Sequence, residues 1–468
     1  MAPTDGPGRW HPGKITAAAV GLLGLAVGIA TPFDFLPDAA QSALGLIVFA
    51  VLFWSSQALP LELTSLLLLL AMPALGLLTF DQSFAPFAQK TLWLLFAGMV
   101  ISQAITHSRT DEYLAWRCFR SFTASPFRLL VGVHLLGLFM SLLVPSGMVR
   151  VLILVPLGIK LAERWGGRKD PALAPAILAA LVCSTYYGGC GVLTGSVPNI
   201  VVAAQLEQYA DRSLLWTEWF RWMFPIVGLF RTVICLAVVW LIWGRKVRRF
   251  DLLQTTGQLS ETGARLDPRM AAVLGAGVLL WLTDGYHQLA PTYVGLLMVV
   301  FLLAPRIGLL PVTELRHINF PFFFYFAALI SVGTALEKSG FNAEFARYVT
   351  ANIELGALGW FGRHLAITCI VVPLDFLMDI AAVAGMITPT MLEIGRSTGM
   401  AEVPVAMSVA MATTLVFLPY QAAPFMIAIS YRQLPVASMI LTMVLISTAS
   451  LIVLCPLNLL YWRWLGFI

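Results

Sequence analysis

The sequence predicts an all-α polytopic membrane protein, and three observations support this class. Hydrophobic residues make up 59% of the 468 residues and charged residues only 11%, whereas soluble domains carry roughly 25% charged residues. The mean hydropathy is +0.85. Apolar runs that suit membrane-crossing helices recur along the whole chain. The N-terminus is polar and no early apolar core precedes a cleavage site, so we expect no secretory signal peptide.

Short basic clusters predict the orientation of these runs. Cytoplasmic loops are enriched in Lys and Arg, so we assign to the cytoplasm the clusters at 109–128, 160–169, 245–249 and 306–316. The N-terminal tail, 1–14, is then cytoplasmic, and three spans bring the chain outside near residue 80. The formal charge of +5 lies largely in these loops. It therefore indicates contact with membrane lipids and not with nucleic acid, and we expect a bacterial inner membrane as the location.

Residues 127–162 form the first unusual element. Both ends are basic, and the two limbs are short for full spans. This predicts a re-entrant hairpin with its tip at the sequence VPSGM. Arg150 follows the tip within an apolar stretch, where a charge is costly unless it is paired or solvated. It is a functional candidate, although a side chain reaching back to the cytoplasmic interface would also explain it.

The second half repeats the order of features of the first. An amphipathic segment precedes a hairpin and then a long apolar segment interrupted by proline, and Pro156 and Pro198 correspond to Pro389 and Pro424. By the charge rule the first hairpin opens to the cytoplasm and the second to the outside. Inverted repeats with broken helices place a binding site near the bilayer midplane. The paired segments are 107–123 and 338–356, 127–162 and 359–392, and 173–204 and 403–430.

The sequence GGCGVLTGSVPN, residues 188–199, is the most loop-like stretch inside an apolar run. Glycine allows close backbone approach and proline ends a helix, so amides and carbonyls become available to ions. A proline-kinked packing helix is the alternative. The second hairpin contains Asp375 and Asp379, and this i, i+4 spacing would place both carboxylates on one face of a helical tip.

These segments resemble the divalent anion:sodium symporter (DASS) family of the ion-transporter superfamily. The resemblance runs from about residue 40 to the C-terminus and includes FWSSQALPLELTSLLLLLAMPALGLL, LWLLFAGMVISQAI, both hairpins and GGCGVLTGSVPNIVVA. It implies a homodimeric scaffold and an elevator-type transport domain that carries dicarboxylate, citrate or sulfate with sodium. The implied division is scaffold at 15–125 and 270–357, with arm helices 107–123 and 338–356; transport domain at 126–243 and 358–468; and a cytoplasmic loop at 244–269.

The ligand motifs depart from this resemblance. The family's Ser-Asn-Thr tip falls on Ser146, Gly147 and Met148, and only the serine is kept; the second tip, at 379–381, keeps nothing. The family's Gly-Thr-Pro-Pro-Asn motif at the first break falls on residues 195–199, where most of it is kept. The corresponding motif at the second break falls on residues 421–425, where only Pro424 is kept. The implied substrate residues are Ser146, Gly147, Arg150, Ser196, Pro198, Asn199, Ala422 and Pro424. The implied ion-binding residues are Ser146, Gly191, Thr194, Asp375 and Asp379.

The expected function is secondary transport of a small anion, with no cofactor and with Na⁺ or H⁺ as a coupling ion. Because the first tip has lost two side-chain donors, we hypothesise that Arg150 replaces a bound cation or partners an acid such as Asp379. Alternatives are a cation/proton antiporter using Asp375 and Asp379, a membrane-embedded enzyme, and a family member that no longer transports. No P-loop or Gly-x-Ser-x-Gly motif occurs, and the histidines lack metal-site spacing.

Overall fold

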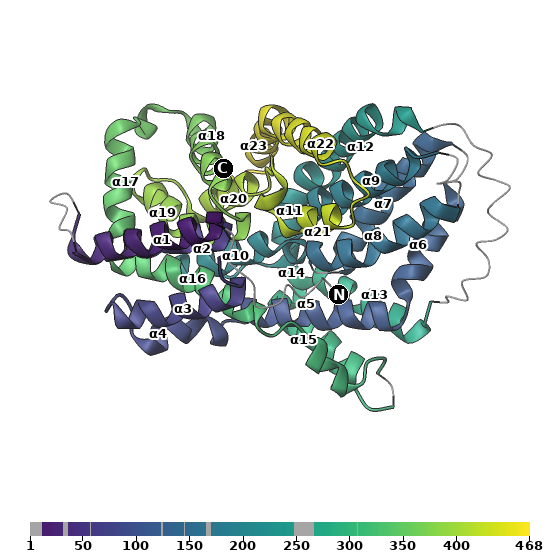
Figure 1. Ribbon diagram of the computed structural model, residues 1–468, viewed down its shortest axis with the longest axis horizontal. Coiled ribbons are helices and arrows are strands. Elements are labelled where there is room, and N and C mark those ends of the chain that lie inside the picture. The colour runs from purple at the N-terminus through teal and green to yellow at the C-terminus, as the bar shows by residue number, and fades with distance from the viewer. Residues whose placement is uncertain are drawn as a thin grey trace.

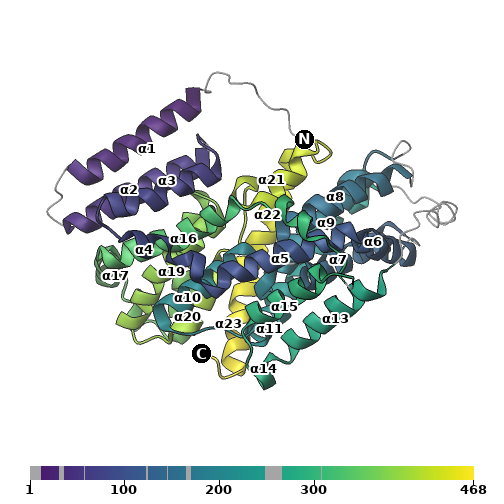
Figure 2. The same cartoon turned by 90° about the horizontal axis from the view of Figure 1, so that it is seen from below.

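The computed structural model describes residues 12–30, 36–56, 58–122, 125–144, 146–164, 170–247, 266–306 and 308–468. Every regular element in these ranges is helical, with no strand (Figures 1 and 2). The all-α prediction is therefore confirmed. Most of the expected N-terminal tail and most of the expected loop 244–269 lie outside the described residues.

The first half begins with three apolar helices and continues through a bent pair into a hairpin and a broken helix. Proline and capping residues set several of its boundaries: Ser125 accepts from the amide of Arg128 ahead of α7, and Pro198 lies in the first turn of α10. The elements are α1 (Pro12–Ala30), α2 (Asp38–Ser56), α3 (Leu61–Ala74), α4 (Phe80–Phe84), η1 (Ala85–Ala88), α5 (Lys90–His107), α6 (Thr110–Ser121), α7 (Pro126–Leu143), α8 (Gly147–Arg164), α9 (Leu173–Gly189), η2 (Leu193–Gly195), α10 (Val197–Ala210), α11 (Trp216–Met223), η3 (Phe224–Phe230, a π-helix), α12 (Arg231–Ile242) and η4 (Gly244–Lys246).

The second half repeats this order. Asp379 caps α19 and Pro424 lies in the first turn of α21. The elements are α13 (Pro268–Leu282), α14 (Asp284–His287), α15 (Pro291–Leu303), η6 (Val312–His317), α16 (Phe322–Lys338), α17 (Phe341–Asn352), η7 (Leu355–Ala357), α18 (Trp360–Val371), η8 (Val372–Phe376), α19 (Ile380–Ser397), α20 (Glu402–Ala412), η9 (Pro419–Gln421), α21 (Ala423–Ser430), α22 (Val436–Ala449), η10 (Ser450–Leu454, a π-helix) and α23 (Cys455–Trp464).

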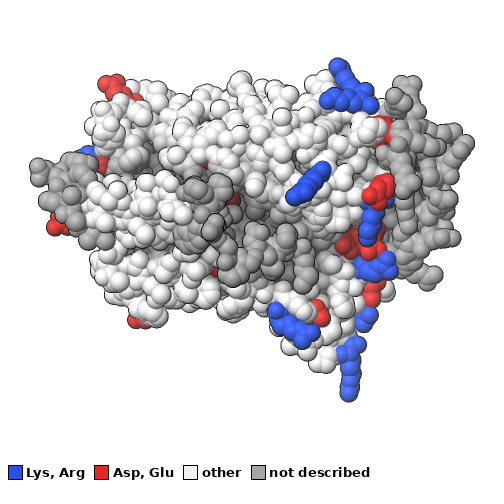
Figure 3. All heavy atoms as spheres, in the orientation of Figure 1, with Lys and Arg blue, Asp and Glu red and all other residues white. Residues whose placement is uncertain are grey.

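Three helical stretches of the described chain are long and apolar enough to cross a membrane unaided: Pro126–Leu143, Trp216–Lys246 and Val436–Trp464. A fourth is obtained if Phe80–Ala88 and Lys90–His107, bent by 46°, count as one span. The other apolar helices are shorter. On the face shown in Figure 3, most Lys and Arg side chains gather toward the right-hand end, beyond a broad band without charge.

The two halves pack in the same way. α7 and α8 both contact α9, and α18 and α19 both contact α20 (Figure 1). The second limb of each broken helix crosses to the other half, because α10 packs against α19 and α20 while α21 packs against α8 and α9. Each hairpin therefore lies next to part of the other half's broken helix.

Candidate functional site

Arg150 lies at the centre of the first candidate site, in the first turn of α8. Its side chain is fully buried. Nη1 donates to the carbonyl of Val144 at 2.6 Å, and Nη2 donates to those of Thr185 and Gly195, both at 2.8 Å. These carbonyls come from the hairpin tip, the last turns of α9, and η2. The guanidinium therefore joins the tip to the first break, which we define as residues 190–196.

The position of this guanidinium has a simple electrostatic reason. The last carbonyls of a helix lack intrahelical partners and carry partial negative charge. Arg150 lies at such an end, that of α9, and forms no ion pair with Asp379 or any other described carboxylate. It is folded inward onto the break, which is not the conformation expected of a side chain reaching the cytoplasmic interface.

Two glycines make room for Arg150. A Cβ on Gly189 would lie 2.3 Å from its Nη2, and a Cβ on Gly195 would lie 2.3 Å from the carbonyl oxygen of Gly189. Real Cβ atoms do not approach other heavy atoms this closely. The glycines of GGCGVLTG therefore allow the guanidinium and two backbone segments to meet.

The remaining predicted residues of the first break hold its backbone. The fully buried Asn199 donates from Nδ2 to the carbonyls of Cys190 at 3.0 Å and Val192 at 2.8 Å. Gly191 packs against Gly228 of η3, and Thr194 accepts from Trp216 Nε1 at 3.4 Å. Gly191 and Thr194 thus contact η3 and α11. Ser196 and Pro198, both buried, begin α10.

Asn199→Ala should lower the free energy of unfolding by roughly 1–3 kcal/mol, because the carbonyl of Cys190 loses its side-chain donor, whereas that of Val192 keeps the amide of Gly195. Thermal unfolding in detergent would measure the loss. The exposed Asn352, whose Nδ2 bonds only the carbonyl of Tyr348, is the matched control, and Asn352→Ala should stay within about 0.5 kcal/mol of wild type. Equal effects at the two positions would contradict the role assigned to Asn199.

The first tip also touches the start of α21, directly after the second break, which we define as residues 413–422. A Cβ on Gly147 would lie 3.3 Å from Pro424 Cγ, and the rings of Tyr186 and Phe425 meet edge to face at 4.9 Å. Ser146, which precedes α8, and Ala422, which precedes α21, are both buried. The fold thus brings predicted residues of the two halves together.

The second tip carries the two predicted carboxylates in different environments. Asp379 Oδ1 accepts from the amide of Ala381 at 2.8 Å and from the hydroxyl of Tyr325 at 3.0 Å. Asp375 is fully buried, and neither of its carboxylate oxygens has a hydrogen-bond partner among the described residues. Its backbone carbonyl accepts from Gln421 Nε2 at 2.7 Å, which ties this tip to the second break.

The expectation that Asp375 and Asp379 share one α-helical face is wrong. Asp375 belongs to the 3₁₀ turn η8, whereas Asp379 is the extended residue that caps α19. Pro373 contributes no amide donor to this turn, and an N-cap aspartate adopts non-helical backbone angles. The two carboxylates therefore lie in separate elements.

Comparison with known proteins decides the family. A model described as the sodium:sulfate symporter transmembrane region matches residues 16–468. The chain belongs to this family. It is the divalent anion:sodium symporter family indicated by the sequence, so that prediction is confirmed. Its members are transporters, and the protein is an integral membrane transporter, not an enzyme.

Individual relatives of this symporter-family chain are distant. An uncharacterized transporter of Haemophilus influenzae is 22% identical over 444 residues, 90% of this chain and 92% of its own. SdcS of Staphylococcus saprophyticus, described as a sodium-dependent dicarboxylate transporter, is 24% identical over 216 residues, 44% of this chain and 40% of its own. The YdaH transporter of Alcanivorax borkumensis has a similar fold, with a TM-score of 0.52 and 15% identity over 85% of this chain and 88% of that one.

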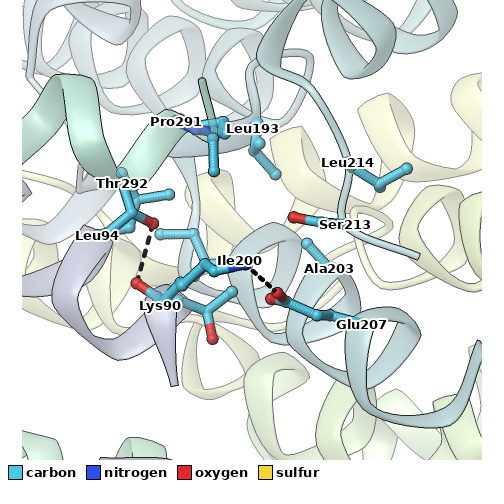
Figure 4. Close-up of a pocket in the computed structure, with 12 residues that line it drawn as sticks. Lys90, Leu94, Leu193, Ile200, Ala203, Glu207, Ser213, Leu214, Pro291 and Thr292 are labelled. Carbon is cyan, nitrogen blue, oxygen red and sulfur yellow. Dashed lines mark hydrogen bonds and ion pairs between the residues drawn. The ribbon is translucent and has the colours of Figure 1, made fainter. Parts of the chain in front are cut away.

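A small hollow of this transporter lies beside the first break (Figure 4). It is bordered by α5, α10 and α15, and Lys90 and Glu207 form an ion pair across it at 3.2 Å. Leu193 of the break and Ile200 of α10 are among the residues that line it. Since neither tip lines it, and neither do Arg150 or Asp375, we do not assign the substrate to this hollow.

The sequence reasoning missed Arg231. It is fully buried at the start of α12, and it is the one charged residue of the apolar run 222–243. The signal that selected Arg150, a charge inside an apolar stretch, was therefore present here as well.

Proposed function

We propose that this chain is a secondary active transporter of a small anion, such as a dicarboxylate, citrate, sulfate or a sulfonate, and that Arg150 serves as a fixed cation at its first site. The observation that carries the proposal is a fully buried guanidinium that is held by three backbone carbonyls and has no carboxylate partner among the described residues. Family membership supports the transport class, and the described dicarboxylate specificity of SdcS supports the substrate class.

The chemistry of broken helices supports the role of Arg150. In transporters of this kind, unwound carbonyls and half-helix C-terminal ends coordinate the coupling cation. Arg150 donates to carbonyls of that type, and the first tip lacks the Asn and Thr side chains that would add oxygen donors. Arginine stays protonated, so a positive charge is present next to the tip without sodium. Nη1 and Nη2 already donate to carbonyls, and Nε, which has no partner among the described residues, is buried; Arg150 would therefore act on the anion mainly through its field.

We further propose an elevator motion within a homodimer, with 126–243 and 358–468 as the moving part, the N-terminus in the cytoplasm and a bacterial inner membrane as the location. The exchange of α10 and α21 between the halves supports one moving unit, because each hairpin packs against part of the other half. The Lys90–Glu207 pair connects this unit to α5 and is partly exposed, at 46% and 27%. Exposed ion pairs contribute about 0–1 kcal/mol to stability, so this pair could break and re-form in each transport cycle at little cost.

Reconstituted liposomes test the transport proposal directly. Uptake of labelled succinate, citrate and sulfate would be compared under an inward sodium gradient, an inward proton gradient and neither. We expect uptake of at least one anion without sodium. A strict sodium requirement would contradict the fixed-cation role of Arg150, and no uptake under any condition would favour a family member that no longer transports.

Asp375 gives a reason to keep cation/proton antiport as a second candidate. A fully buried carboxylate without a partner is costly when ionised, and such groups in membrane proteins often carry protons. The expected signature is cation flux driven by a pH gradient without any organic anion. Anion uptake without such flux would remove this candidate.

For this second candidate, Asp375→Asn should abolish proton-driven flux and change the free energy of unfolding by less than about 1 kcal/mol, because the neutral amide has nearly the same shape. The matched variant is Asp379→Asn. Asparagine is as good an N-cap as aspartate, so this variant should keep flux if Asp375 carries the proton. Flux driven by a pH gradient in Asp375→Asn would contradict the assignment.

A further inference from the structure

We propose that Arg231 is a second fixed cation, seated at the second broken helix as Arg150 is at the first, so that neither broken helix of this chain needs a mobile cation. The inference rests on the proposed anion transport and extends it to a residue outside both hairpins and both breaks. Four observations carry it: the position of Arg231, its missing counter-charge, its open donors, and the way its neighbours hold the second break.

The position of Arg231 matches that of Arg150 in electrostatic terms. Its Nη1 donates to the carbonyl of Thr414 at 3.4 Å. Thr414 follows the end of α20, the first limb of the second broken helix, just as Thr185 lies near the end of α9. A helix C-terminus carries partial negative charge and attracts cations. Both guanidinium groups therefore lie where the first limb of a broken helix ends.

No carboxylate neutralises Arg231 in the part of the chain that the structure describes. The ionisable groups with which it interacts electrostatically are the thiols of Cys190, Cys235 and Cys455 and the phenol of Tyr187. These are ordinarily uncharged at neutral pH. The positive charge is thus opposed mainly by backbone dipoles at the end of α20, as expected for a cation-binding position.

The donors of Arg231 are less satisfied than those of Arg150. Its Nε and Nη2 have no hydrogen-bond partner in the part of the chain that the structure describes, although the side chain is fully buried. If this position served only packing, an apolar residue would give a more stable protein, because buried donors without acceptors are unfavourable. A buried charge in a membrane protein that keeps open donors is a functional candidate by default.

Neighbouring side chains hold the second break close to Arg231. The hydroxyls of Tyr187 and Ser447 both donate to the carbonyl of Val416, at 2.8 and 2.6 Å. The same helix, α12, also packs against the first break region, because a Cβ on Gly188 would lie 3.0 Å from Thr232 Oγ1. Consecutive residues of α12 therefore contact the two broken helices, and this places Arg231 between them.

The test measures whether an added cation can replace the missing side chain. Anion uptake into liposomes would be compared in choline, sodium and millimolar guanidinium at equal ionic strength. In choline, Arg231→Ala should reduce uptake at least roughly tenfold, as expected for loss of a charge-assisted hydrogen bond. Sodium or guanidinium should restore part of it, whereas wild type should respond to neither. Arg231→Lys should keep sodium-independent uptake, and the exposed Arg221→Ala should match wild type.

A second readout does not require transport. The unfolding temperature of purified Arg231→Ala should be higher in sodium or millimolar guanidinium than in choline, whereas that of wild type should not change. Arg231→Gln is used if the alanine variant does not fold. Equal shifts in wild type and variant, or uptake in choline that Arg231→Ala leaves unchanged, would overturn the inference. If wild type takes up no anion but the variant still gains a cation-dependent shift, the transport proposal fails and the cation position stands.

Discussion

Arg150→Ala is expected to abolish sodium-free anion uptake and to destabilise the transporter strongly. The substitution removes one donor each from the buried carbonyls of Val144, Thr185 and Gly195. Val144 keeps the amide of Ser146 and Thr185 keeps the hydroxyl of Ser141 as donors, so the cost of about 1–3 kcal/mol for an unsatisfied group applies to the carbonyl of Gly195. It also removes the positive charge proposed to attract the anion. Uptake in choline buffer and thermal unfolding of the purified variant measure the two effects separately.

Two further variants sharpen this prediction. Arg150→Lys keeps a charge, but a compact ammonium cannot span carbonyls arranged around a planar guanidinium, so uptake should stay low while stability is partly restored. Arg347, whose side chain is 73% exposed, is the control, and Arg347→Ala should lie within about 0.5 kcal/mol of wild type. Wild-type uptake by Arg150→Ala in choline would refute the role proposed for this residue.

Gly195→Ala should have the second large effect, mainly on folding. Its Cβ would lie 2.3 Å from the backbone oxygen of Gly189, and no side-chain rotation can relieve a clash with backbone. Such overpacking costs about 1–3 kcal/mol and occasionally more. Gly189→Ala instead meets the end of the Arg150 side chain, so it should displace the guanidinium and reduce uptake more than stability.

Gly275 provides the matched control for both glycine variants. It lies within α13, and a Cβ there would meet nothing within 4 Å. Gly275→Ala should therefore stabilise the protein by about 0.4–1 kcal/mol. Thermal unfolding under the same conditions ranks the stabilities of the three variants. A Gly195→Ala variant as stable as Gly275→Ala would mean that the first break is not packed as described.

Local sequence signals predicted the elements well because they act within a few residues. Prolines at 198 and 424 lie in the first turns of α10 and α21, where their lack of an amide proton does no harm. The hairpin limbs were predicted at 127–162 and are observed as Pro126–Leu143 and Gly147–Arg164. The second tip was predicted less well, because the i, i+4 spacing of Asp375 and Asp379 takes no account of a 3₁₀ turn followed by a cap.

By itself, the sequence determined that the chain is helical and membrane-embedded, that it contains two hairpins and two broken helices in repeated order, and that Arg150 is a charge in an apolar stretch. Hydropathy, proline and glycine express these features locally. Only the tertiary structure decided that Arg150 turns onto carbonyls of the first break, that Arg231 meets the second, and that α10 and α21 exchange between the halves. The physical reason is that the partners of a buried charge are backbone groups distant in sequence, and no residue type marks which carbonyl a helix end leaves open.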